Sequence, residues 1–174
     1  MTETKTDELV GRGNKEGADL FREWFDSLAD AAKNGRGAAY VFVMGSMAEL
    51  LHVFDFPLVL PEITSLQTTV RRVADTYLAE AEYYGYSPDI CSYLTSDVGS
   101  WLRKTTPLTK AFGLRGVPKP DVLVYNTNQC RDVKDWFQFY AREWNVPCFG
   151  VHTPRAIGDI DDEMINYVAG QIEA

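Results

Sequence analysis

The sequence predicts an α/β domain in which helices cover the faces of a parallel sheet. The clearest evidence lies in residues 121–151, which read as a buried strand, a polar turn, an amphipathic helix and a second strand. Two earlier apolar, strand-like runs are each followed by a helical pattern. This alternation is typical of sheets whose strands all point the same way, with ligands bound at the edge formed by their carboxyl ends. We therefore expect a flavodoxin/Rossmann-like fold and a single domain over residues 1–174.

The elements follow in order from the period of the apolar residues and from turn chemistry. Residues 1–17 are polar and are expected to be frayed. Helices are expected at residues 18–32, 47–54, 66–84, 91–101, 130–144 and 163–174. Strands are expected at residues 39–43, 57–60, 122–125 and 148–152. Gly85 and Asn145 suit helix ends, and residues 104–120 form a loop with several glycines and prolines.

The charge balance argues against several classes of function. The 174 residues carry 17 basic and 25 acidic side chains, a net charge of −8, which would repel nucleic acid. No apolar run is long enough to span a bilayer, and the polar N-terminal residues do not form a secretory signal. We therefore expect a soluble cytoplasmic protein that binds neither nucleic acid nor membrane.

The three cysteines, Cys91, Cys130 and Cys148, are too few and odd in number for a disulfide scaffold. Cys91 and Cys130 each follow polar turn residues and precede a predicted helix. Helix N-termini favour thiolates and can donate hydrogen bonds to cluster sulfur atoms. Cysteine is also a common small core residue, and the spacing leaves both interpretations open. A zinc site is disfavoured because His52, expected in the core, and His152 have no close partner cysteine.

Several short motifs between Tyr40 and Pro154 carry a resemblance to a known family. They are AELL at 48–51, Pro61-Glu62, GYSPDICSYLTSDVG at 85–99, PKPDVLVYNTNQC at 118–130, KDWF at 134–137 and NVPCFGVHTP at 145–154. Together they resemble the 2-hydroxyacyl-CoA dehydratase and benzoyl-CoA reductase family of radical-generating iron–sulfur enzymes. The segment Leu60-Pro61-Glu62, followed by Gln67 and Arg71-Arg72, looks closer to the catalytic subunits of the benzoyl-CoA reductases.

By this resemblance, Cys91 and Cys130 correspond to two of the three cysteines that hold a [4Fe–4S] cluster in each catalytic subunit. The third cysteine lies in a second α/β half that this sequence lacks. The chain thus resembles the N-terminal half of a subunit that usually has two domains, either as a fragment or as a short subunit completed by another chain. Cys148 falls where the family usually has an aliphatic strand residue, so we expect it in the core, with ligation as the alternative.

The resemblance also implies a reaction and its partners. A separate ATP-hydrolysing iron–sulfur activator delivers electrons to the clusters of two homologous catalytic subunits. An acyl-CoA substrate binds in a dry pocket, and one-electron reduction of its thioester gives a ketyl radical anion. Dehydratases then eliminate a hydroxyl group, whereas benzoyl-CoA reductases add electrons and protons to the aromatic ring. The same motifs serve both outcomes.

Further site candidates lie near the predicted strand ends. Glu49 matches the family's Glu-Leu position and is the candidate catalytic acid/base if it is desolvated, with an exposed helix glutamate as the alternative. Ser46 is a second catalytic candidate that could hydrogen-bond a substrate carbonyl, or it is an N-cap. Asn128 and Gln129 are substrate-binding candidates, or ordinary turn residues. Asp97 matches a family position, with a local helix or capping contact as the alternative.

Two functions without a cluster compete with this interpretation. One is a flavodoxin-like module that binds a CoA ester or a nucleotide, which the absence of a GxGxxG or P-loop pattern disfavours. The other is an assembly subunit that docks a partner through an apolar face. The last predicted helix, still periodic at Ala174, supports that second alternative.

Overall fold

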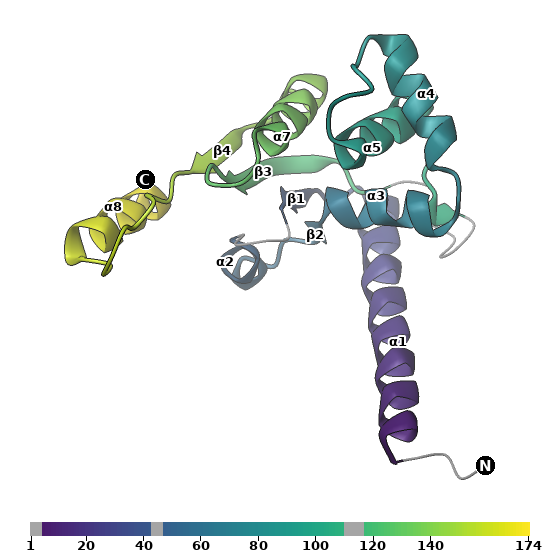
Figure 1. Cartoon of the computed structure of the whole chain (residues 1–174), viewed down its shortest axis with the longest axis horizontal. Helices are drawn as coiled ribbons and strands as arrows, with labels where there is room; N and C mark the ends of the chain where they lie inside the picture. The colour runs from purple at the N-terminus through teal and green to yellow at the C-terminus, as the bar shows by residue number, and fades with distance from the viewer. Residues whose placement is uncertain (1–4, 43–46, 110–116) are drawn as a thin grey trace.

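The computed structural model describes residues 5–42, 47–109 and 117–174, and a four-stranded parallel sheet lies at its centre (Figure 1). The strands, in the spatial order β2-β1-β3-β4, are β1 (Ala38–Val41), β2 (Leu58–Val59), β3 (Pro120–Asn126) and β4 (Cys148–Val151). The register pairs Val41 of β1 with Val124 of β3, and Asn126 of β3 with Val151 of β4. The predicted α/β architecture with parallel strands is confirmed.

Capping residues mark several of the helix ends. They include α1 (Lys5–Lys33), α2 (Ala48–Val53), α3 (Pro61–Val70), α4 (Ala74–Tyr84), α5 (Ser92–Leu102), α7 (Arg131–Trp144) and α8 (Asp162–Glu173). Gly85 (φ 113°) and Asn145 (φ 50°) adopt the left-handed conformation at the C-caps of α4 and α7, as predicted. Asp161 caps α8 by accepting a hydrogen bond of 2.9 Å from the Met164 amide.

Two helices differ from the prediction in extent. α1 begins at Lys5, so residues 5–17 are helical rather than frayed. The single helix expected at 66–84 is two helices, α3 and α4, separated by residues 71–73, where Arg72 has a φ of 55°. α3 already begins at Pro61, because the missing N–H of proline costs nothing in the first turn of a helix. Residues 71–73 contain neither glycine nor proline. The helical period of the apolar residues continues through them, so the sequence did not predict the break.

Alternate residues of the central strands face two different apolar clusters. Tyr40 and Leu123 join the larger cluster, which side chains of α1, α5 and α7 complete. Val41 and Val124 belong to the smaller cluster, against which residues of α2 pack. Side chains alternate between the faces of a strand, so both faces of the sheet are covered, as is usual for parallel strands. Figure 1 shows α7 and α2 on opposite faces.

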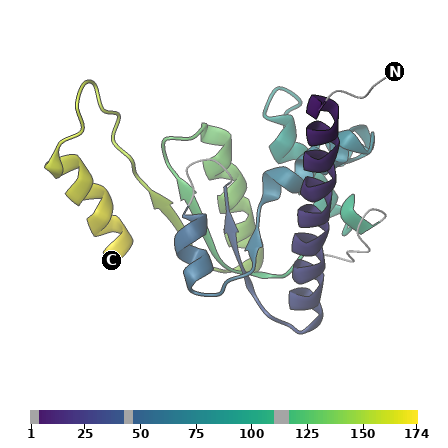
Figure 2. The same ribbon diagram turned by 90° about the horizontal axis from the view of Figure 1, so that it is seen from below.

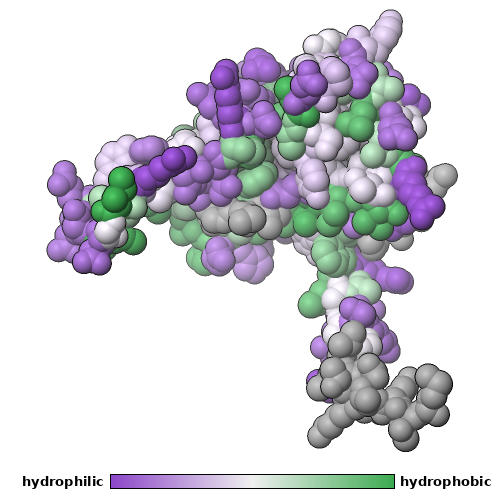
Figure 3. All heavy atoms as spheres, in the orientation of Figure 1, coloured by the Kyte–Doolittle hydropathy of each residue, from purple (hydrophilic) through white to green (hydrophobic). Residues whose placement is uncertain are grey.

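Two helices extend from the body of the molecule, α1 on one side and α8 on the other (Figures 1 and 2). The end of α1 packs on the core through Phe25 and Leu28, whereas Leu20 is exposed. No residue of α8 is buried, although the whole of α8 is described. Apolar side chains also reach the surface on α2 and α3, including Val53 and Val70. Figure 3 shows green, hydrophobic spheres over α3. Within the described ranges, no helix has the length and apolar character needed to cross a bilayer.

Candidate functional site

The carboxyl ends of β1, β3 and β4 meet at one edge of the sheet, because these parallel strands are neighbours. Glu49 is in the first turn of α2, which follows β1. Residues 127–130 connect β3 to α7, and His152 directly follows β4. Ser46 lies outside the described residues. Four of the predicted site residues therefore lie at this edge, namely Glu49, Asn128, Gln129 and Cys130. Cys130 is the residue among them that carries a thiol.

Cys130 is the N-cap residue of α7, as the sequence predicted. Its backbone is extended (φ −64°, ψ 154°), and its carbonyl oxygen accepts a hydrogen bond of 3.2 Å from the Val133 amide, which starts the helix. The side chain is exposed and makes no capping hydrogen bond. The thiol therefore stands beside the free N–H groups of a helix N-terminus, a position that suits an anionic ligand.

Cys91 occupies the same position at the start of α5. Its carbonyl oxygen accepts hydrogen bonds from the Thr95 amide (3.1 Å) and the Thr95 hydroxyl (3.2 Å). The side chain makes no capping hydrogen bond, is half-buried and packs against the larger apolar cluster. Both predicted ligands are thus N-cap cysteines whose thiols play no part in capping their helices.

Hydrogen bonds between buried side chains join α5 to α7. Asp97 of α5 is 4% exposed, and its Oδ2 accepts hydrogen bonds from Trp136 Nε1 (3.0 Å) and from the Tyr140 hydroxyl (2.5 Å), both on α7. Burial raises the pKa of Asp97 to about 7, and the two hydrogen bonds offset that effect only in part. Asp97 therefore contacts a second helix, rather than making the local helix or capping contact that was the alternative.

The order of contacts shows that α5 and α7 run in the same direction. Asp97 contacts Trp136 and Tyr140, whereas Trp101, one turn further along α5, packs its ring 5.3 Å from that of Phe139 and 6.4 Å from that of Trp144. A step forward along α5 is therefore a step forward along α7. We infer that the two helices begin at the same end of the pair, the end at which each carries its N-cap cysteine.

These two thiols do not make a complete metal site by themselves. Within residues 5–42, 47–109 and 117–174, no three side chains of His, Cys, Asp or Glu gather closely enough to hold a metal ion. Cys148 begins β4, at the opposite edge of the sheet from Cys130. It packs against the larger apolar cluster, and burial raises the pKa of its thiol to about 11. Its position and protonation both suit the core role predicted for it.

In α2, Glu49 has the exposed position that was the alternative to a desolvated one, and the expectation for His52 is wrong. Glu49 is exposed, so the part of the chain that the structure describes does not provide the desolvated environment on which its acid/base role was conditional. His52, expected in the core, is also exposed, because α2 is a short helix without a buried residue. Only the inner side of α2, around Leu51, packs against the smaller apolar cluster. The sequence shows the apolar residues of α2 but not how little of the helix the sheet covers.

Asn128 and Gln129 lie in the turn before Cys130, where Asn128 is exposed and Gln129 is half-buried. A contact that the sequence did not reveal ties this turn to the end of β4. The Thr127 amide donates a hydrogen bond of 2.9 Å to the Val151 carbonyl, and Thr127 Oγ1 lies 2.9 Å from Nδ1 of His152. The only available signal was that both residues directly follow strands of one parallel sheet.

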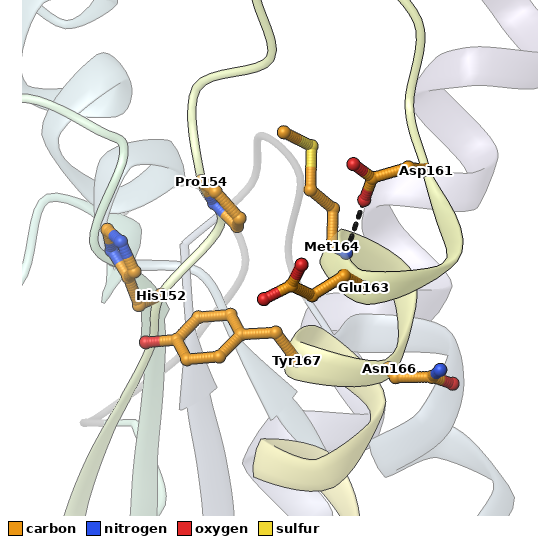
Figure 4. Close-up of a pocket in the computed structure, with 7 residues that line it drawn as sticks. All are labelled: His152, Pro154, Asp161, Glu163, Met164, Asn166 and Tyr167. Atoms are coloured by element: carbon orange, nitrogen blue, oxygen red, sulfur yellow. Dashed lines mark hydrogen bonds between the residues drawn. The ribbon is translucent and has the colours of Figure 1, made fainter.

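Two cavities lie away from the thiols. A groove of about 930 Å³ between β4 and α8 is lined by His152, Pro154, Asp161, Glu163, Met164, Asn166 and Tyr167 (Figure 4). Its two carboxylates are unfavourable for the phosphate groups of a CoA ester. A cavity of about 380 Å³ is lined by Tyr40, Asp97, Tyr140 and Trp144, among others, and extends to the last residues of α5 and α7. Among the described residues, no cysteine lines either cavity.

Comparison with known proteins gives the family. The model of the family described as "2-hydroxyglutaryl-CoA dehydratase, D-component" matches residues 13–174. The chain belongs to this family. It is 27% identical over 150 residues to a benzoyl-CoA reductase subunit of Thauera aromatica, a match that covers 86% of this chain and 34% of that protein. It is 26% identical over 158 residues to the (R)-2-hydroxyisocaproyl-CoA dehydratase alpha subunit of Clostridioides difficile, covering 89% of this chain and 36% of that protein.

The chain therefore spans about a third of the length of these curated relatives. Both relatives are named as subunits of acyl-CoA enzymes, one a reductase and the other a dehydratase. Membership of the dehydratase D-component family confirms the resemblance given by the motifs around Cys91 and Cys130.

Proposed function

We propose that the chain is part of an iron–sulfur subunit of an ATP-dependent, radical-forming acyl-CoA reductase of the benzoyl-CoA reductase type. In this proposal Cys91 and Cys130 hold a [4Fe–4S] cluster. The observation that carries it is the N-cap position of both cysteines on helices that begin at the same end of a pair. The similarity to a dehydratase subunit, 26% against 27% for the reductase subunit, makes a 2-hydroxyacyl-CoA dehydratase the second candidate.

The donor chemistry of the two cysteines fits such a cluster. Cysteine thiolates are the usual ligands of iron–sulfur clusters, and free N–H groups at a helix N-terminus can donate hydrogen bonds to cluster sulfur. The described residues provide two thiols at one end of the α5–α7 pair but no gathered group of three ligands. The remaining ligands would therefore come from another segment or another subunit. A homologous second catalytic subunit and an ATP-hydrolysing iron–sulfur activator belong to the same proposal.

When bound, the cluster would supply single electrons to the thioester of an acyl-CoA. This chain's residues would bind and orient that substrate and exclude water. The amide of Asn128, exposed beside Cys130, can donate a hydrogen bond to a thioester carbonyl. The contact between Thr127 and His152 would hold the turn in place, and Gln129 directly precedes Cys130 in that turn. Glu49 would need a covering partner to act as a buried proton donor.

Metal analysis of single cysteine variants tests the proposal. The chain is produced without oxygen together with the subunit or segment that completes it, and iron and acid-labile sulfide are measured. We expect a brown protein that loses most of its iron in Cys91→Ser and Cys130→Ser. Cys148→Ser is the matched control and should keep its iron, because Cys148 starts β4 at the other edge of the sheet.

Two outcomes would count against the cluster. A metal-free complex would contradict it, and so would equal iron loss in all three variants. If the complex contains no iron but still binds an acyl-CoA in the Cys91/Cys130 double variant, the function is that of a CoA-ester-binding module. Turnover of benzoyl-CoA against a 2-hydroxyacyl-CoA by the complete system then separates the reductase from the dehydratase.

A further inference from the structure

Asp97 is a buried carboxylate whose partners lie on the helix that carries the second thiol. Two donors spaced four residues apart on α7, Trp136 and Tyr140, converge on a single oxygen of Asp97, at 3.0 and 2.5 Å. A buried carboxylate is costly unless it is hydrogen-bonded. The protein places this buried acceptor at a point where both donors of α7 can reach it.

These hydrogen bonds constrain the helix pair in a way that the surrounding apolar contacts do not. A hydrogen bond weakens steeply when its distance or angle departs from a narrow range. Apolar burial is not directional, and although the edge-to-face contact of Trp101 with Phe139 has a preferred geometry, aromatic pairs occur over a range of ring separations. If α7 slid along α5, or turned about its own axis, both donors would leave Asp97 together. The bonds of Asp97 thus define the register of the two helices.

That register sets the relation between the thiols. Cys91 precedes Asp97 by six residues on α5, and Cys130 precedes Trp136 by six residues on α7. Because the helices run in the same direction, the two N-caps lie at similar distances from the Asp97–Trp136 contact. We propose that Asp97 is a positioning residue that, through Trp136 and Tyr140, fixes the separation of the Cys91 and Cys130 thiols. The importance of this role rests on the proposed cluster, but the separation itself can be measured without iron.

Thiol cross-linking in the full chain tests the proposal. Cys148→Ser leaves Cys91 and Cys130 as the only thiols, and this parent is treated with bifunctional thiol reagents of graded spacer length. We expect one spacer length to be strongly preferred in the parent. Asp97→Leu removes both hydrogen bonds and should lower that preference about tenfold, the size of effect that losing a buried charge-assisted hydrogen bond has on an equilibrium. Asp97→Asn keeps an uncharged acceptor and should restore part of the preference.

Matched variants separate positioning from general stability. Ser100→Ala removes a buried hydrogen bond of the same helix, from the Ser100 hydroxyl to the Asp97 carbonyl (2.8 Å), without touching α7, and should keep the parent spacer profile. Tyr140→Phe removes one donor only and should give an intermediate profile, and it replaces Asp97→Leu if that variant does not fold. Circular dichroism confirms that each compared variant is folded.

An unchanged spacer profile in folded Asp97→Leu, or in Tyr140→Phe when Asp97→Leu does not fold, would overturn the proposal. So would an equal change in Ser100→Ala. The cluster proposal can fail separately: a parent complex without iron whose spacer preference still depends on Asp97 would contradict the cluster and leave the positioning role standing. An iron-containing complex whose spacer profile does not change in the Asp97 variants would contradict the positioning role and leave the cluster proposal standing.

Discussion

The α5–α7 pair and the β4–α8 unit are held in different ways. Between α5 and α7 lie buried side chains, including Phe137 at 0% exposure, and the hydrogen bonds of Asp97. α8 is attached to β4 through Val168 in the smaller apolar cluster and through the Gln171 side chain, which pairs with the backbone N–H and C=O of His152 (2.8 and 2.9 Å). This chain's own core therefore holds α5 against α7, whereas one partly buried side chain and two exposed hydrogen bonds hold α8 against β4.

The largest expected difference between the two regions is in stability. Phe137→Ala should lower the free energy of unfolding by about 3–5 kcal/mol, because it leaves a cavity in the centre of the core. Tyr167→Ala, on the half-exposed face of α8, should cost less than about 1 kcal/mol. Urea unfolding followed by circular dichroism measures both. Similar losses in the two variants would contradict the contrast between the regions.

The buried region should contribute a pH dependence of stability through Asp97. Burial raises the pKa of Asp97 to about 7 from its ordinary value of 3.8, so between these pH values the folded state holds a proton that the unfolded state has lost. Stability should therefore fall as pH rises through this window and level off above it. From about pH 5 to pH 8, the stability of the parent relative to Asp97→Asn should fall by roughly 2–3 kcal/mol.

Tyr140, which donates a hydrogen bond to Asp97, and Tyr40, whose ring packs against that of Tyr140, do not titrate in this window. Burial, helped by the Asp97 charge, raises the pKa of both phenols above the ordinary value of 10.0. Urea titrations of the parent and of Asp97→Asn at several pH values provide the measurement. A parent whose stability rises with pH relative to Asp97→Asn would show that the Asp97 carboxylate is better stabilised than its burial indicates.

The smallest effect is expected at the attachment of α8. Gln171→Ala removes both hydrogen bonds to the backbone of His152, yet these lie at an exposed site and should contribute about 1 kcal/mol or less in total. Global stability should hardly change, whereas hydrogen exchange of the His152 amide should become faster. Amide exchange in α7 should stay unchanged. If α7 also exchanged faster, the two regions would be coupled more closely than their contacts indicate.

Local patterns predicted much of the architecture and part of the candidate site. The alternating strand and helix periods predicted the parallel sheet, and turn residues placed Cys91 and Cys130 at helix starts. The break at residues 71–73 was missed because a left-handed Arg72 has no glycine or proline signature. The exposure of Glu49 and His52 was missed because the apolar residues of a short helix do not show how much of it the sheet covers.

The order of residues was enough to specify the strands, most of the helices, the helix ends at Gly85 and Asn145, and the resemblance to the family, because periodicity, capping and motifs are properties of neighbouring residues. The packed fold was needed to show that Asp97 meets donors about forty residues away on α7, and that Thr127 meets His152 across two strands. Such contacts depend on strand order and on the direction in which helices pack, and no local pattern encodes either. For the same reason, sequence could place each thiol on its helix, whereas only packing could show that the two helices begin at the same end.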